Sequence, residues 1–126
     1  MQRETKQRAS IRRILQACAS PLLPVEVLQR ARKNVPTMGL ATVYRTLNAF
    51  AREGLARVVS LPGEPARYEK AGKSHHHHFV CRSCHRVFEV LACVGSVQKM
   101  APAGFQVLEH EITLYGACRK CARTVK

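Results

Sequence analysis

The stretch His75-His76-His77-His78-Phe79-Val80-Cys81-Arg82-Ser83-Cys84 joins an unbroken run of histidines to a C-x-x-C pair. A second pair of the same form, Cys118-Arg119-Lys120-Cys121, follows near the end of the chain, with residues 85–117 between the two pairs. Thiolate and imidazole are strong protein ligands for zinc, and two C-x-x-C turns complete a tetrahedral four-sulfur site. We therefore predict a structural zinc that clamps the C-terminal strand to a sheet, held by Cys81, Cys84, Cys118 and Cys121. A redox-active pair is the alternative, and the duplication with flanking arginine and lysine favours zinc.

The four histidines can serve two metal sites. Successive side chains of a strand face opposite sides of the sheet, so His75 shares a face with His77, and His76 with His78. Carboxylates on nearby predicted strands would complete one site, with the ligands Glu69, His76, His78 and Glu89. Such a site would bridge the two halves of the chain, and its occupancy would set the angle between them, as a sensor requires. An expression tag or a solvated polar run is the alternative, and the nearby cysteine pair argues against both.

The remaining cysteines and the N-terminus indicate the compartment. Cys18 belongs to an apolar helical stripe and is interpreted as a core thiol. Cys93 lies outside both pairs and is interpreted as a spare thiol, with a metal ligand as the alternative. The chain begins with a polar segment that lacks the apolar core of a signal peptide, and it has no run of 18 apolar residues. We therefore expect a cytoplasmic protein with no membrane contact, where paired cysteines are more often metal ligands than disulfides.

The N-terminal half is predicted to form three helices and a β-hairpin. Apolar residues at helical spacing and breaker residues between them place helices over 5–19, from Pro24 onward, and over 40–52. Two strands, over 55–60 and 66–70, flank the turn at 61–65. This order is that of a winged helix-turn-helix, in which the last helix enters the major groove of DNA.

The C-terminal half is predicted to be mainly strands, over 77–81, 87–91 and 105–115, with a short helical piece over 94–101. Together the two halves make an α+β chain, which we divide into domains at 1–71 and 72–126. The domain over 72–126 is too small to be stable on apolar burial alone and needs a bound metal or a partner chain, which agrees with its two cysteine pairs.

The charge of the chain favours a polyanionic partner. Its 126 residues contain 21 lysines and arginines and 8 aspartates and glutamates, a formal net charge of +13. Nucleic acid is the usual partner of such an excess, and a solvated basic surface that aids solubility is the alternative.

In its helix, histidine and cysteine motifs the chain resembles the ferric uptake regulator family of bacterial metal-responsive repressors. The resemblance is carried by Gly39-Leu40-Ala41-Thr42-Val43-Tyr44-Arg45-Thr46-Leu47, by the histidine run closing on Cys81, and by Leu114-Tyr115-Gly116-Ala117-Cys118. It implies an N-terminal winged helix followed by a small α/β dimerisation domain, whose zinc-stapled sheet we expect to be antiparallel. It also implies repression of metal-uptake or stress genes when a regulatory metal is bound.

The resemblance also implies roles for individual residues. Bases or phosphates of a double-stranded DNA operator would be contacted by Arg8, Thr42, Tyr44 and Arg45. The four cysteines would hold structural zinc, and the regulatory site would match the set Glu69, His76, His78 and Glu89. A further metal site would match His75, His77 and His110. The regulatory ion would be Zn²⁺ or Fe²⁺, with Mn²⁺ as a further option, and the histidine run is closest to the zinc-uptake branch.

Three departures from the family pattern stand out. The loop 21–24 lacks the histidine that often joins the regulatory site, and Ser96 stands nearest to the place of a glutamate in the further site. His85 follows the first cysteine pair where glycine is usual, and histidine tolerates positive φ better than most residues.

The leading hypothesis is a homodimeric, metal-dependent repressor that reads a palindromic operator and has no small-molecule substrate. A peroxide-sensing, iron-bound repressor of the same family is one alternative, and a basic metal store or chaperone is another. An enzyme is not expected, because the sequence contains no H-E-x-x-H motif and nothing resembling a nucleophile–base pair.

Overall fold

The computed structural model describes residues 5–123 and divides the chain into two compact units, Met1–Lys73 and Ser74–Lys126. The two units are described separately below. Within the described residues, no helix has the length and apolar character needed to span a bilayer.

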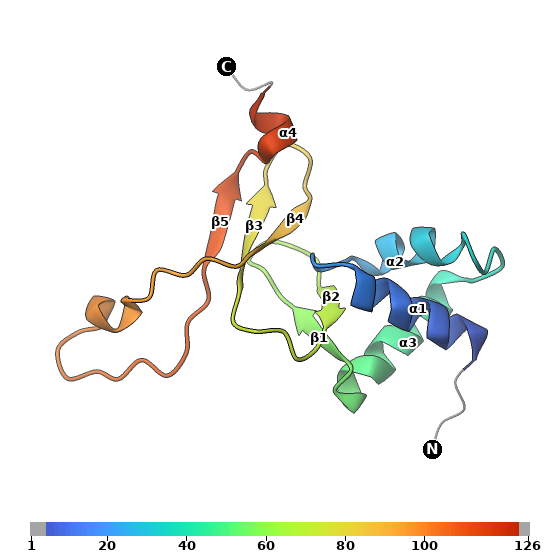
Figure 1. The fold of residues 1–126 in the computed structure, drawn as a ribbon, viewed down its shortest axis with the longest axis horizontal. Coiled ribbons are helices and arrows are strands. Elements are labelled where there is room, and N and C mark those ends of the chain that lie inside the picture. Colours follow the sequence, from blue (N-terminus) through green and yellow to red (C-terminus); the bar gives the residue numbers. More distant parts are fainter. Residues whose placement is uncertain (1–4, 124–126) are drawn as a thin grey trace. The chain divides into compact units, whose positions relative to one another are not determined.

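The first unit contains three helices, α1 (Lys6–Ala17), α2 (Pro24–Ala31) and α3 (Leu40–Glu53) (Figure 1). The hydroxyl oxygen of Thr5 accepts a hydrogen bond from a backbone N–H in the first turn of α1 and caps that helix. Gly54 ends α3 in the left-handed region at φ 79°, which glycine adopts without the clash that a Cβ would bring. The predicted helices are therefore present, with bounds shifted by one or two residues.

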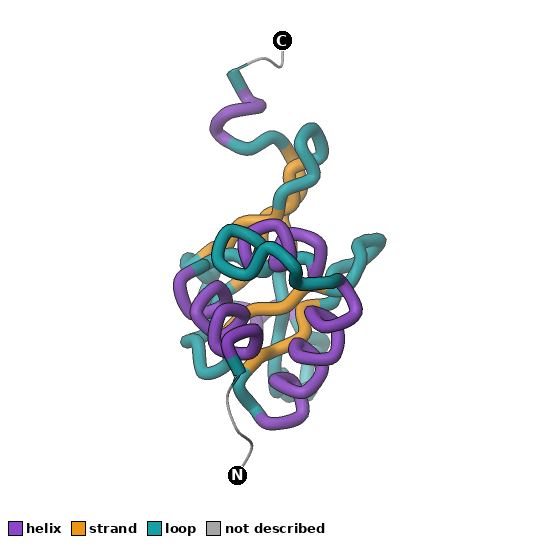
Figure 2. The backbone as a smooth tube through the Cα atoms, turned by 90° about the vertical axis from the view of Figure 1, so that its right-hand side faces the viewer, coloured by secondary structure: helices purple, strands orange, loops and turns teal. Residues whose placement is uncertain are grey.

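The core of the first unit lies where these helices meet (Figure 2). Its members follow the helical stripes read from the sequence, and Cys18 packs against them as a half-buried side chain. The buried residues are Ile11, Leu15, Leu22, Val27, Leu28, Ala31, Met38, Val43, Leu47, Phe50, Ala56 and Tyr68. Burial of these apolar side chains is the main stabilising term of the unit.

A β-hairpin completes the first unit. Strand β1 (Ala56–Val59) pairs antiparallel with β2 (Arg67–Lys70). The backbone of Tyr68 exchanges two hydrogen bonds with Leu22, at 2.9 and 2.8 Å, and the Tyr68 hydroxyl donates to Oδ1 of Asn48 on α3 at 3.0 Å. The hairpin is thus tied both to the loop before α2 and to α3, which agrees with the predicted winged helix-turn-helix.

The second unit is built on a three-stranded sheet. Its central strand is β3 (His77–Cys81), with β4 (Val87–Val90) on one side and β5 (Thr113–Gly116) on the other. The one-turn helix η1 (Val97–Met100) lies in the long segment between β4 and β5, which loops out beyond the sheet, and α4 (Arg119–Ala122) follows β5 (Figure 1).

The sheet is mixed, so the expectation of an antiparallel sheet is wrong for one pairing. β4 runs antiparallel to β3, but β5 runs parallel to it. The cysteines explain the direction: Cys81 ends β3 and Cys118 follows β5 by two residues, so four sulfurs can meet only if both strands end on the same side. Gly116 permits close pairing there, because a Cβ at this position would lie 3.2 Å from the Phe79 ring.

Two further expectations in this unit are wrong in extent. The strand predicted over 105–115 is regular only from Thr113, because β3 and β5 pair from His78↔Thr113 to Cys81↔Gly116 and the residues before Ile112 lie beyond the end of β3. A strand needs a neighbouring strand for its backbone hydrogen bonds, and this segment pairs with no strand in the described chain. The backbone groups of Phe105 and Val107 bond instead to the side chain of Gln98. The helix predicted over 94–101 is the single turn η1.

The packing of α3 can be tested with a pair of leucines. Leu47 is fully buried, whereas Leu40 in the same helix is 40% exposed. Leu47→Ala should lower the free energy of unfolding by about 2–5 kcal/mol, because it leaves a cavity in the core. Leu40→Ala should change it by about 0.5 kcal/mol or less. Urea titration of the full chain, followed by helical circular dichroism, measures both, and equal losses would contradict this assignment of the core.

Candidate metal centres and nucleic-acid interface

The four paired cysteines meet at the end of the mixed sheet. Their sulfur atoms all lie within 4.8 Å of one another, and the sulfurs of Cys84 and Cys118 are 3.9 Å apart. A tetrahedral zinc ion with Zn–S distances of about 2.3 Å holds its sulfurs about 3.8 Å apart. The geometry therefore fits the predicted zinc site.

Backbone amides stabilise negative charge in this cluster. The N–H groups of Cys84 and Cys118 both donate to the sulfur of Cys81 at 3.4 Å, and they lower the pKa of Cys81 to about 5. A backbone hydrogen bond from Cys121 lowers the pKa of Cys118, while the side-chain hydrogen bond with Cys118 raises the pKa of Cys121 to about 12. The four thiols therefore cannot all ionise on their own, and a divalent cation would allow them to do so.

Arg86 and His85 lie beside the four-cysteine cluster. Arg86 hydrogen-bonds to Cys84, which raises the pKa of the guanidinium, and it keeps a positive charge beside the sulfurs. His85 has φ 63°, in the left-handed region that its place after the first cysteine pair requires, and its N–H donates to the carbonyl oxygen of Cys81 at 2.9 Å.

A second cluster lies at the other end of β3. It contains the three histidines of the predicted further site together with one cysteine: His75, His77, Cys93 and His110. Nε2 of His75 and Nε2 of His110 are 3.1 Å apart. The Cys93 sulfur lies 3.1 Å from His110, 3.3 Å from His77 and 3.5 Å from His75, measured to Nε2 in each case.

Sequence reasoning ranked Cys93 as a spare thiol and assigned the open position of this site to Ser96. The register of the hairpin does not by itself point to Cys93. β3 and β4 pair antiparallel with His77 opposite Val90, so the chain beyond Val90 runs past the residues just before His77. Continued pairing would place Ala92 opposite His75 and Cys93 on the other face, so Cys93 reaches the histidines because the chain leaves β4 after Val90.

The even-numbered histidines form a third group. The rings of His76 and His78 lie 5.1 Å apart, and His78 is the register partner of Glu89 on β4. Nδ1 of His76 lies 2.8 Å from the Ser74 carbonyl oxygen, to which it can only donate, so Nε2 is the ring atom suited to a metal. Glu69, the fourth member of the predicted set, belongs to β2 in the first unit, where it lies 3.8 Å from the Lys73 ammonium.

The residues predicted to meet DNA lie on α1 and α3. Tyr44 is 46% exposed on α3, and Arg45 beside it donates to the hydroxyl of Thr42 at 3.2 Å. Arg8, by contrast, is engaged within the unit. Its guanidinium lies 2.8 Å from the Glu53 carboxylate and 4.6 Å from the centre of the Phe50 ring.

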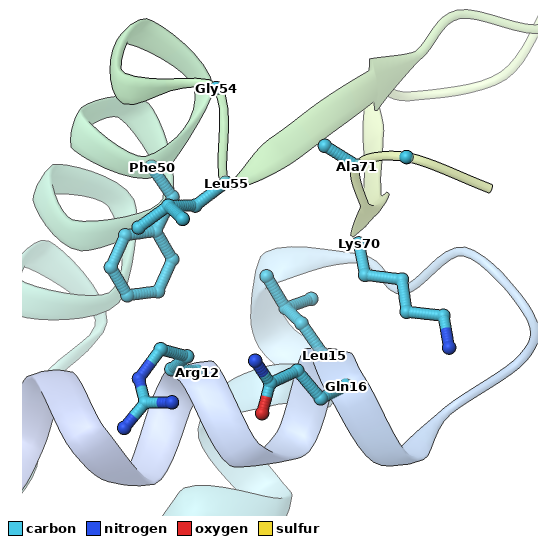
Figure 3. Close-up of a pocket in the computed structure, with 9 residues that line it drawn as sticks. Arg12, Leu15, Gln16, Phe50, Gly54, Leu55, Lys70 and Ala71 are labelled. Atoms are coloured by element: carbon cyan, nitrogen blue, oxygen red, sulfur yellow. The ribbon is translucent and has the colours of Figure 1, made fainter.

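A shallow pocket also lies in the first unit, between α1, the end of α3 and the end of β2 (Figure 3). It is lined by Arg12, Leu15, Gln16, Phe50, Gly54, Leu55, Lys70, Ala71 and Gly72. This lining contains no histidine, cysteine or carboxylate, so the pocket is unsuited to a metal ion.

Comparison with known proteins decides the family. The profile of the Ferric uptake regulator family matches residues 2–115. The chain belongs to the ferric uptake regulator family. Members of this family are metal-responsive transcriptional regulators, and this member carries histidine and cysteine clusters suited to zinc or iron.

Individual relatives in this family span several metals. The zinc uptake regulation protein of Mycobacterium tuberculosis is 32% identical over 122 residues, covering 94% of both chains. The ferric uptake regulator of Francisella tularensis, solved with iron, is 25% identical, with a TM-score of 0.78 over 96% of this chain and 95% of that one. The ferric uptake regulator of Helicobacter pylori, described as having three functional metal-binding sites, is also 25% identical, with a TM-score of 0.74 over 95% of this chain and 82% of that one.

The four-cysteine cluster can be tested by substitution. Cys84→Ser should remove one zinc ion per chain after mild chelation and should unfold the second unit, since the binding free energy of such a zinc is also folding free energy. Cys18→Ser, at a half-buried thiol of the first unit, should keep the zinc content of the unaltered protein. Elemental analysis and circular dichroism check both. Full zinc content in Cys84→Ser would contradict the assignment.

Proposed function

We propose that this regulator is a metal-dependent repressor that binds palindromic operator DNA as a homodimer when its regulatory metal is bound. It would control metal-uptake or stress genes in the cytoplasm. The observation that carries the proposal is the combination of a winged-helix unit, with Tyr44 and Arg45 exposed on its third helix, and a second unit with separate clusters of metal ligands.

DNA recognition is assigned to α3. The N-terminal residues of a recognition helix reach the base edges, and Thr42, Tyr44 and Arg45 lie in the first two turns of α3. Arg45 is suited to a bidentate contact with guanine, and the excess of lysine and arginine supplies attraction to phosphates. Arg8 would reach a phosphate only by giving up its ion pair with Glu53, so its contribution is expected to be the smaller one.

Homodimer formation is supported by apolar side chains on the second unit. Large apolar side chains are exposed from the end of β4 through β5, at Leu91, Val94, Met100, Phe105, Leu108, Leu114 and Tyr115. Leu108 is 86% exposed, which is unusual for leucine. Part of this region, the strand predicted over 105–115, alternates apolar and polar residues, and its residues before Ile112 lie beyond the end of β3. A second copy of the chain would supply the strand that these residues lack as a neighbour.

The regulatory metal is assigned to the even-numbered histidines. His76 presents Nε2, His78 shares its face, and Glu89 lies opposite His78. Glu69 would complete the set from the hairpin of the first unit. A ligand set drawn from both units would couple the presence of the ion to the DNA-binding arrangement, because the bound ion favours one of two states.

The recognition helix can be tested with two arginines of α3. Operator DNA is obtained by selecting random duplexes with the metal-loaded protein. Arg45→Ala should weaken binding to the selected duplex by about 1–3 kcal/mol, through loss of a base contact. Arg52→Ala, at the other end of the same helix, should have a much smaller effect. Titration at fixed salt compares the two, and unchanged affinity in Arg45→Ala would refute the assignment.

The metal switch can be tested separately. His76→Ala should abolish most of the gain in DNA affinity on adding Zn²⁺ or Fe²⁺, while retaining the zinc of the four-cysteine site. His85→Asn, which alters a histidine outside the three clusters, should keep that gain. DNA titrations with and without metal, at constant structural zinc, provide the measurement. Equal affinities of metal-loaded and chelated unaltered protein would exclude a sensor and would favour a metal store.

A further inference from the structure

Cys93 has three imidazole nitrogens within hydrogen-bonding range of its sulfur. Its sulfur lies 3.1, 3.3 and 3.5 Å from Nε2 of His110, His77 and His75. A thiol donates one proton and its sulfur accepts only weakly, so a neutral thiol makes poor use of three such neighbours. Nitrogen and sulfur atoms gathered this closely are the donor set that a cation shared among them favours.

The separations match those of a cation site. A tetrahedral zinc ion with Zn–N of about 2.0–2.1 Å and Zn–S of about 2.3 Å holds its ligand atoms about 3.3–3.6 Å apart. The His75–His110 separation of 3.1 Å and the sulfur separations of 3.1 and 3.5 Å agree with this to within a few tenths of an ångström. His75 and Cys93 are exposed, so an ion can enter from solvent.

His77 takes a different part in the cluster. The backbone N–H of Ile112 donates to its Nδ1 at 3.1 Å, which occupies that lone pair. The neutral ring then carries its proton on Nε2, which lies 3.3 Å from the Cys93 sulfur. His76 shows the opposite arrangement, because its Nδ1 faces a carbonyl oxygen.

We propose that Cys93 is a metal ligand, that it forms a nitrogen–sulfur site with His75 and His110, and that His77 donates a hydrogen bond to its sulfur. The site binds zinc in preference to manganese(II) or iron(II). Thiolate is a soft ligand that favours zinc, whereas manganese(II) favours carboxylate and other oxygen donors. Coordination replaces the thiol proton, which leaves to solvent, and the hydrogen bond from His77 orients the sulfur as outer ligands do in metal sites.

This inference deepens the proposed function, because it names the cation that one cluster of a metal-responsive regulator selects. Its test measures coordination rather than DNA binding. A regulator that failed to bind an operator could still have this site, and a repressor could function without it.

Cobalt(II) provides the probe, because it takes the place of zinc and shows a near-ultraviolet charge-transfer band only when a thiolate is bound. The full-length protein is treated with a mild chelator, which leaves zinc in the four-cysteine site, and is then titrated with cobalt chloride. The unaltered protein should develop the band without releasing zinc. Cys93→Ser should lose it, and Cys18→Ser, the matched cysteine control, should retain it. Absence of the band in the unaltered protein, or its persistence in Cys93→Ser, would overturn the proposal.

Zinc affinity and fold complete the test. Competition between Zn²⁺ and Mn²⁺ should show a zinc preference that falls at least about tenfold in Cys93→Ser, and an unchanged preference would overturn the assignment. His77→Gln should keep the cobalt band while weakening zinc binding by about 10- to 100-fold, as removal of an outer hydrogen bond does. Loss of the band in this variant would contradict the donor role of His77. Cys93→Ala checks the result independently, and thermal unfolding followed by circular dichroism verifies the fold of each variant.

Discussion

The sulfur of Cys81 is the atom around which the second unit is organised. It accepts backbone hydrogen bonds from Cys84, in the turn after β3, and from Cys118, at the start of α4. Two segments that are distant in sequence therefore converge on one negative charge. The parallel pairing of β5 with β3 follows from this, because each strand must deliver its cysteines at the same end of the sheet. In a unit this small, a metal ion bound by the four cysteines would supply stability that apolar burial supplies in the first unit.

The first unit was largely predictable because its signals are local. The apolar stripe through Ile11 and Leu15, the proline that opens α2 and the glycine that ends α3 each act within a few residues. The ion pair of Arg8 with Glu53 was not predictable, since its partners are 45 residues apart and no pattern links them. Sequence reasoning assigned Arg8 to a contact with DNA, whereas in the folded unit its guanidinium forms an ion pair with Glu53.

The second unit was predictable in its ligands and less so in its topology. Cysteine pairs indicate a shared metal site at any separation in sequence, but they do not indicate the direction of the strands that carry them. The alternation over 105–115 predicted a strand, but it carries no information on where β3 ends. The role of Cys93 depends on where β4 ends, because continued pairing with β3 would place Cys93 opposite Ser74, on the other face from His75. Patterns along one segment therefore identified the histidines, while the departure of the chain from β4 after Val90 was needed to find the thiol that joins them.

The histidine run that leads into β3 places its imidazoles alternately on the two faces of the sheet, while Cys81 at the end of β3 lies in the four-cysteine cluster. The spacing between His78 and Cys81 therefore sets which face each histidine occupies. Adding or deleting one residue there would invert the faces, because side chains alternate with a period of two. Because the four histidines are consecutive, three of the four positions would still hold an imidazole after such a shift, and one position would lose it. The uniform run therefore makes the proposed ion sites less sensitive to the length of this spacer than a mixed set of ligands would be.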